Sequence, residues 1–240
     1  MPMLDIHAQV GHLVAEKPER SRVFERHGLD YCCGGKRSLE DACRDKSLDP
    51  STVLAELEAL DAEPEADEIS PADMSMTELV DHIVETHHRY LRGELPRLEG
   101  LIDKVTTVHA RAYPWLEELR QTFADLVAEL EPHMAKAEQV LFPMIRELDR
   151  AIDGPSFHCG SVSNPILVME HEHDAAGFAL NRLRELTSDF TPSEGACNSF
   201  RAMLDGLAAL ETDLHLHIHK ENNVLFVRAV EAEERLNSAG

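Results

Sequence analysis

Four histidines lie on apolar helical stripes of this sequence, and their spacing suggests metal binding. Steps of three and four residues along the last long segment join Leu210, Leu214, His217 and Glu221 on one face. Each of the other three long segments carries one histidine on its own apolar line, and these are His88, His133 and His173. Each segment is therefore expected to direct one imidazole into the interior.

Five buried polar groups need partners. Placing four imidazoles and a carboxylate among apolar side chains costs on the order of several kcal/mol unless each group is satisfied. A metal centre would satisfy them together, and imidazole with carboxylate but no thiolate favours iron or manganese over structural zinc. Helical bundles often hold pairs of such metals, bridged by a carboxylate with one oxygen on each metal, and Glu221 is the candidate bridge.

The other ten histidines are not predicted to be ligands, because a single histidine on a helix is usually a hydrogen-bonded structural residue. Five lie outside the stripes and are expected at the surface or in turns: His7, His12, His27, His109 and His158. Five more project from other helix faces and are expected to be structural, with roles beside the ligands or along a channel as the alternative: His82, His87, His171, His215 and His219.

A second reactive feature is the adjacent pair Cys32 and Cys33, followed by Gly34 and Gly35. The glycines indicate a turn, which is expected to leave both thiols near the surface. Adjacent cysteines are poorly placed to pair with each other, and the odd total of five argues against a disulfide framework. Reduced thiols in a cytoplasmic protein are the better fit.

Four long segments with helical apolar spacing must position the histidines, and no β-type alternation is present, so an all-α fold is predicted. Short connections favour an antiparallel four-helix bundle. Pro96, Pro132 and Pro143 fall inside the segments and are expected to kink or divide them. The expected segments are residues 75–108, 114–151, 165–188 and 193–236.

Shorter helical patterns precede the bundle, with Pro18 and Pro50 placed as first-turn prolines. These patterns cover residues 6–16, 18–27, 38–44 and 50–60. An acidic, proline-bracketed run without apolar periodicity then indicates a linker. The predicted organisation is a small helical N-terminal domain at residues 1–62, a linker at 63–73 and the bundle at 74–240.

Charge and hydropathy exclude some partners. The formal charge is −22, from 45 acidic and 23 basic residues, so nucleic acid and anionic membranes are not expected to bind. No stretch approaches the roughly 20 apolar residues of a membrane span, and the N-terminus lacks the pattern of a secretory signal. A cytoplasmic location is expected, and a homodimer is left open.

The motifs resemble the repair-of-iron-centres family, the ScdA- and YtfE-like proteins, over nearly the whole chain. The matching stretches are residues 30–36, His133 and Met134, residues 138–145, residues 172–174 with Gly177, and His217 with residues 221–226. The resemblance implies a short N-terminal domain joined to a hemerythrin-like bundle. It also implies a non-haem centre of two carboxylate-bridged irons, and a role in restoring iron–sulfur clusters damaged by nitric oxide or peroxide.

Individual roles follow from the motif positions. The implied iron ligands are His88, His133, His173, His217 and Glu221. Glu129 and Glu172 match acidic positions beside the ligands or along a channel, and Glu138 matches a separate acidic position. Cys32 and Cys33 match the paired thiols of the family.

The chain departs from the family at Ala137, where a second bridging glutamate is expected four residues after His133. In a regular helix Glu138 is turned by about 100° from Ala137, so it can substitute only where the helix is distorted. Either the site is weakened here or another ligand fills the gap, and the second iron is expected to be held less securely than the first.

The leading functional hypothesis is an iron donor for iron–sulfur client proteins under nitrosative or oxidative stress, rather than an enzyme in the strict sense. An incomplete ligand shell would ease release, and Cys32 and Cys33 could accept the iron or engage the client. One alternative is a di-iron nitric oxide reductase. Another is a module that binds or senses oxygen or nitric oxide, against which the cysteine-bearing domain argues, because a carrier has no evident use for it.

Overall fold

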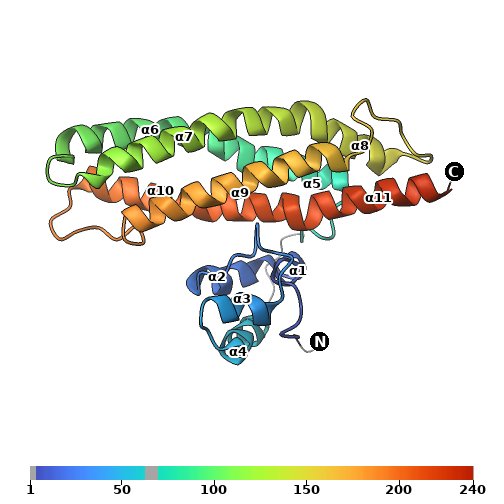
Figure 1. The fold of residues 1–240 in the computed structure, drawn as a ribbon, viewed down its shortest axis with the longest axis horizontal. Coiled ribbons are helices and arrows are strands. Elements are labelled where there is room, and N and C mark those ends of the chain that lie inside the picture. The colour runs from blue at the N-terminus through green and yellow to red at the C-terminus, as the bar shows by residue number, and fades with distance from the viewer. Residues whose placement is uncertain (1–3, 63–69, 240) are drawn as a thin grey trace. The chain divides into compact units, whose positions relative to one another are not determined.

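The computed structural model describes residues 4–62 and 70–239. Residues 1–3, 63–69 and 240 lie outside this range, and with them most of the linker predicted at 63–73. Within the described residues the secondary structure is helical, with two isolated bridges and no strand. The predicted all-α class is confirmed (Figure 1).

Four long helical runs follow the N-terminal helices, and three of them contain a π-helical segment. The first run joins α5 (Met76–Ile83), η2 (Val84–His88) and α6 (Arg89–His109). The second joins α7 (Trp115–Lys136), η3 (Ala137–Leu141) and α8 (Phe142–Arg150). The third is α9 (Ser163–Leu186), and the fourth joins α10 (Asn198–His219), η4 (Lys220–Leu225) and α11 (Phe226–Ala239).

The π segments η2, η3 and η4 contain His88, Ala137 and Glu221 respectively. Such wider turns change the register of the side chains that follow them, and they are frequent at functional sites. Interruptions were expected at prolines instead. Pro96 and Pro132 lie inside α6 and α7, which continue through them, so these prolines do not divide the helices.

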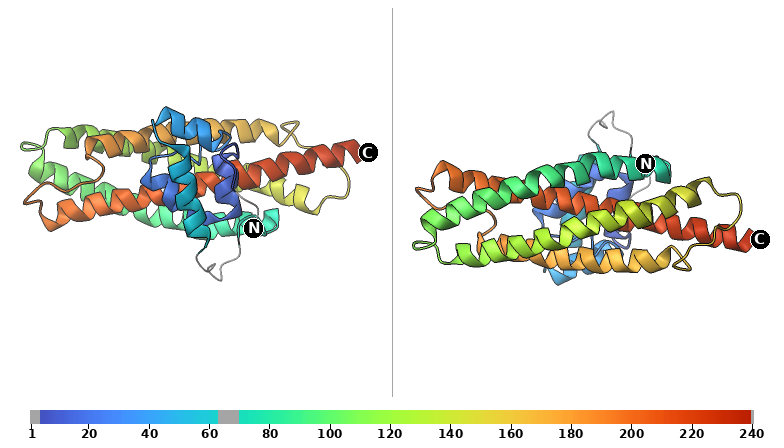
Figure 2. Two further views of the ribbon diagram at one scale, coloured as in Figure 1. Left: turned by 90° about the horizontal axis from the view of Figure 1, so that it is seen from below. Right: turned by 90° about the horizontal axis from the view of Figure 1, so that it is seen from above.

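The chain forms two compact units, each built from separated stretches. The first unit comprises Met1–Val80, Ile145–Ser156 and His215–Gly240, and the second comprises Asp81–Met144 and Phe157–Leu214. In the second unit α6 packs against α7, and α7 against α9, as lengthwise neighbours (Figure 2). Their interior is apolar and includes Leu91, Leu98, Leu126, Leu180 and Leu210.

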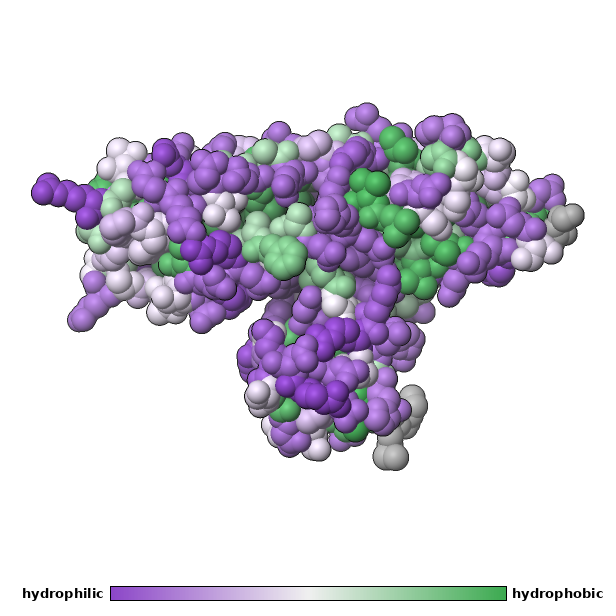
Figure 3. Space-filling view, in the orientation of Figure 1, coloured by the Kyte–Doolittle hydropathy of each residue, from purple (hydrophilic) through white to green (hydrophobic). Residues whose placement is uncertain are grey.

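The N-terminal part of the first unit folds into short helices around its own apolar core. These are α1 (Val10–Glu16), the 3₁₀ turn η1 (Pro18–Arg20), α2 (Ser21–Arg26), α3 (Leu39–Asp45) and α4 (Pro50–Asp61). Pro18 and Pro50 occupy first turns as predicted, and Ser38 and Asp49 cap the starts of α3 and α4. The face of these helices that is seen in Figure 3 is mostly hydrophilic.

An ion pair joins the first helices of this N-terminal part to its last helix. Arg20 is buried and donates from Nη2 and Nε to the carboxylate oxygens of Asp61, at 2.6 and 3.1 Å. Such a two-point contact fixes both the distance and the orientation of its partners. It joins η1 to the last residue of α4.

Candidate metal centre

Two histidines of the second unit face each other across a short gap. His133 from α7 and His173 from α9 are each 2% exposed. Their Nε2 atoms lie 3.2 Å apart. A metal about 2.1 Å from two imidazole nitrogens holds them about 3.0–3.4 Å apart, depending on the coordination angle. The two nitrogens are therefore spaced as two ligands of one metal would be.

A carboxylate orients the ring of His133. Its Nδ1 donates to Glu172 Oε2 at 2.9 Å, and Lys136 also binds this carboxylate. Because an ionised carboxylate can only accept, the proton must be on Nδ1, which leaves the Nε2 lone pair available to a metal. Burial alone would raise the pKa of Glu172, but its hydrogen bonds with Lys136 and His133 outweigh burial and lower that pKa.

His88 is oriented in the same way. It is fully buried at the end of η2, and its Nδ1 donates to Glu138 Oε1 at 2.6 Å. Arg92 donates to the same oxygen at 2.6 Å. Burial opposes ionisation of Glu138, but the bonds from His88 and Arg92 outweigh it and lower the pKa. Glu138 is thus ionised at neutral pH and available to hold the imidazole.

These contacts show what Glu138 does beside Ala137, where a second bridging glutamate was expected. Ala137 is buried at the first residue of η3, so the helix is distorted there as substitution by Glu138 would require. The Glu138 carboxylate nevertheless bonds to His88 Nδ1 and Arg92, and so supports an imidazole. Glu129, the third acid singled out from the sequence, is exposed on α7.

The first unit holds a second buried pair of potential ligands. His217 in the last turn of α10 is 1% exposed, and Glu221 in η4 is fully buried. His217 Nε2 lies 3.2 Å from Glu221 Oε1, again the spacing of two ligands on one metal. A carboxylate removed from water in this way requires a cationic or hydrogen-bonding partner. Imidazole and carboxylate donors together fit an iron or manganese ion.

Two further histidines are buried although their sequence positions predicted a structural place on other helix faces. His87 in η2 donates from Nδ1 to Asp213 Oδ1 at 2.9 Å. His219 is buried at the end of α10, and burial lowers its pKa to about 4. No sequence signal links His87 to Asp213, because they lie on different helices. Of the five histidines outside the stripes, His7, His12 and His158 are exposed, and His27 and His109 are partly buried.

The cysteine pair differs from its predicted placement. Cys32 is only 5% exposed, and Cys33 is half-buried, so the expectation of two surface thiols was wrong for Cys32. A hydrogen bond with Cys33 and burial raise the pKa of the Cys32 thiol well above its ordinary value. Cys32 is therefore a protonated thiol at neutral pH. None of the five cysteines, all of which lie in the described residues, forms a disulfide.

Comparisons with known proteins agree with these features. Residues 79–229 match the family model described as the hemerythrin HHE cation binding domain. Residues 6–61 match ScdA_N, a domain of unknown function. The chain therefore belongs to the ScdA- and YtfE-like family that joins these two domains, and the predicted resemblance is confirmed.

Particular relatives are similar over most of their length. The chain is 39% identical over 224 residues to the iron-sulfur cluster repair protein YtfE of Yersinia pseudotuberculosis serotype IB (strain PB1/+), covering 93% of this chain and 97% of that protein. The protein of the same description from Yersinia pestis (strain Pestoides F) matches to the same extent. In the described part of this chain, no helix has the length and apolar character that crossing a membrane requires.

Proposed function

We propose that this chain repairs iron–sulfur clusters by donating iron, which it holds with the side chains of His88, His133, His173, His217 and Glu221. The observation that carries the proposal is the set of buried donors, with the two 3.2 Å ligand pairs His133–His173 and His217–Glu221. All five residues fall within the cation-binding family match. The repair role comes from the Yersinia relatives, which are described as iron-sulfur cluster repair proteins.

The ligand set suits a pair of ferrous ions, with Glu221 as the bridge. Glu172 and Glu138 hold His133 and His88 with their Nε2 lone pairs unprotonated, so these imidazoles are ready to bind metal. Ala137 supplies no second bridging carboxylate. Fewer anionic ligands mean weaker attraction for the cation in a low-dielectric interior, which eases release of the cargo.

The iron would pass to iron–sulfur client proteins, with Cys32 and Cys33 as the thiols that mediate transfer. A cytoplasmic location fits the five cysteines, which form no disulfide. Nitrosative or oxidative stress, which destroys such clusters, would be the condition in which the protein acts.

The proposal is tested by replacing a ligand and its neighbour on the same helix. His217→Ala should lower ferrous iron bound after anaerobic reconstitution by half or more, whereas His215→Ala should leave it within error. Only the ligand variant should also fail to activate an apo iron–sulfur enzyme. Equal iron loss in both variants would refute the assignment. Formation of nitrous oxide by the wild type, without activation of the apo-enzyme, would refute the donor function.

A further inference from the structure

The turn that carries the cysteine pair also brings a carboxylate to the thiols. Asp30 Oδ1 accepts hydrogen bonds from the backbone N–H groups of Cys32 and Cys33, both at 3.0 Å. Its other oxygen, Oδ2, accepts from the N–H of Gly34 at 3.0 Å. Aspartate commonly closes turns in this way. As a result, one carboxylate and two thiols lie close together in this turn.

The donor atoms have the separations of a tetrahedral metal site. Cys32 Sγ lies 3.8 Å from Cys33 Sγ and 3.3 Å from Asp30 Oδ1. A metal about 2.3 Å from two sulfurs and about 2.1 Å from an oxygen would place the sulfurs about 3.8 Å apart, and sulfur and oxygen about 3.6 Å apart. The donor atoms of all three residues lie within 4.8 Å of one another. Only small shifts of the donor atoms are needed to bind an ion.

Access and donor type both suit a transient site. Asp30 is exposed and Cys33 is half-buried, so an ion can enter from solvent and a fourth ligand can reach it. Thiolate ligands select softer ions such as ferrous iron, zinc or cuprous copper. This donor set is therefore softer than the imidazole and carboxylate donors of the proposed iron centre.

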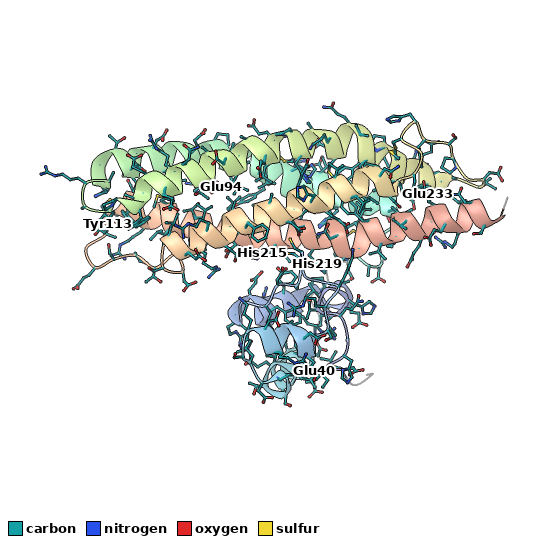
Figure 4. The ribbon with its side chains drawn as sticks, viewed as in Figure 1. Glu40, Glu94, Tyr113, His215, His219 and Glu233 are labelled. Carbon is teal, nitrogen blue, oxygen red and sulfur yellow. The ribbon has the colours of Figure 1, made fainter. Side chains whose placement is uncertain are left out.

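The loop is held against the segment that carries Glu221. Asn223 in η4 donates from Nδ2 to the carbonyl oxygens of Cys32 and Tyr31, at 2.9 and 3.2 Å. The Tyr31 ring also contacts the rings of His215 and His219, whose places on α10 are labelled in Figure 4. The loop and the carboxylate ligand thus belong to one compact unit.

We propose that Asp30, Cys32 and Cys33 form a mononuclear site for a thiophilic divalent cation, with ferrous iron in transit as its physiological ligand. The transit role rests on the proposed donor function, whereas the site itself does not. Binding releases the two thiol protons to solvent and changes no oxidation state. Two thiolates and one carboxylate leave one position of the tetrahedron for a ligand from a client or from solvent.

Cobalt(II) is the probe, because thiolate ligation gives it a charge-transfer absorption that imidazole and carboxylate ligands do not. The intact reduced chain is titrated anaerobically, and the thiolate band should level off at the intensity of one thiolate-bound cobalt per chain, while the imidazole and carboxylate donors take up further cobalt without adding to this band. Cys32→Ser and Cys33→Ser should remove most of the band. Asp30→Asn keeps an oxygen for the turn but loses the anionic ligand, so it should weaken binding by about tenfold or more. Cys197→Ser, an exposed cysteine elsewhere, should change nothing.

The outcomes separate the site from the donor function. Unchanged helicity by circular dichroism is required of each variant, and the Asp30→Asn variant tests the site even if a serine variant unfolds. No thiolate band in the wild type, or a band that survives in the Cys32→Ser and Cys33→Ser variants, overturns the site. Activation of an apo-client is measured in parallel. Failure of activation with the cobalt band intact overturns the donor function and the transit role but supports the site.

Discussion

Asn223 Nδ2 lies 2.9 Å from the carbonyl oxygen of Cys32, so a side chain of η4 binds the backbone of the turn that carries the cysteine pair. The Asn223 amide fits between two glycines. A Cβ atom at Gly35 would lie 2.2 Å from Asn223 Oδ1, and one at Gly11 would lie 2.5 Å from it. Neither glycine has a positive φ, so their role is to admit the close approach of Asn223.

The first prediction tests the close approach of the Asn223 amide to the glycines by adding one methyl group. Gly35→Ala should displace the Asn223 amide and release the loop, because the clash is with a side-chain end that can move. Cys32 should then react with a maleimide at least about tenfold faster. Lowering the free energy of opening the loop by about 1.4 kcal/mol raises the population with an exposed thiol tenfold. Asn223→Ala should give the same increase. Gly93→Ala, in an open part of α6, is the matched control and should leave the rate unchanged.

The second prediction concerns the carboxylate that orients His88. Glu138→Gln removes the charge and weakens the hold on Nδ1, so the affinity for ferrous iron should fall about 10–100-fold. Glu129→Gln makes the same chemical change at an exposed site of the adjoining helix α7 and should have no effect. Competition with a ferrous chelator measures both. Equal affinities for the two variants would mean that the Glu138–His88 bond does not support iron binding.

The helices could be predicted from the sequence because their apolar periodicity extends over many residues. The run predicted at 50–60 is observed as Pro50–Asp61, and that predicted at 75–108 is observed from Met76 to His109. The fourth run begins later than expected, at Asn198 rather than residue 193. Each stripe histidine is buried as its helical face predicted.

Other structural features could not be predicted from the sequence pattern. A π segment is five or six residues long, too short to alter a periodicity counted over several turns, so η2, η3 and η4 could not be foreseen. Asn223 lies close to Gly11 and Gly35, which are distant from it in the sequence. Burial of Cys32 follows from the Asp30 turn, whose hydrogen bonds appear only in three dimensions.

The third prediction is a pH dependence of the N-terminal helices. Burial would raise the pKa of Asp61, but its bonds and attraction to Arg20 outweigh burial and hold the pKa below its ordinary value. A lowered folded-state pKa stabilises the fold above the unfolded pKa of about 3.9, and this stability is lost as the pH falls through the folded value. Asp61→Asn should therefore destabilise the N-terminal helices by about 2–3 kcal/mol at pH 7.

This difference should shrink as the pH falls below about 4, because the carboxylate of the unfolded chain is protonated first and that of the folded protein follows at a lower pH. Circular dichroism during denaturation follows all the helices together, so unfolding of the N-terminal helices is the part of its signal that Trp115 fluorescence does not share. Fluorescence of Trp115, the single tryptophan, reports on α7 of the other compact unit and serves as the internal control. A difference between wild type and variant that is constant from pH 7 to pH 3 would show that the Asp61 charge contributes nothing.

The last prediction concerns Ala137, which is buried at the start of η3, four residues after His133. Ala137→Glu would add a carboxylate at the position where the family resemblance predicts a second bridge. An added anionic ligand offsets cationic charge in a low-dielectric interior, where pairing is much stronger than in water. The variant should hold iron at a stoichiometry nearer two per chain, release it to a chelator at least about tenfold more slowly, and unfold at a higher temperature when loaded with iron.

Both proteins are reconstituted anaerobically with ferrous iron, and iron per chain, release rate and melting temperature are measured for each. Without iron the variant should be less stable than the wild type, because a buried carboxylate then lacks its cation. A variant that is less stable than the wild type without iron but more stable with it has gained a metal ligand, because a side chain that merely improves packing would stabilise both forms. Ala137→Gln, of similar size but uncharged, is the matched control and should not slow release. If the present chain already holds two irons as tightly as the Ala137→Glu variant, another group completes the site and Ala137 does not weaken it.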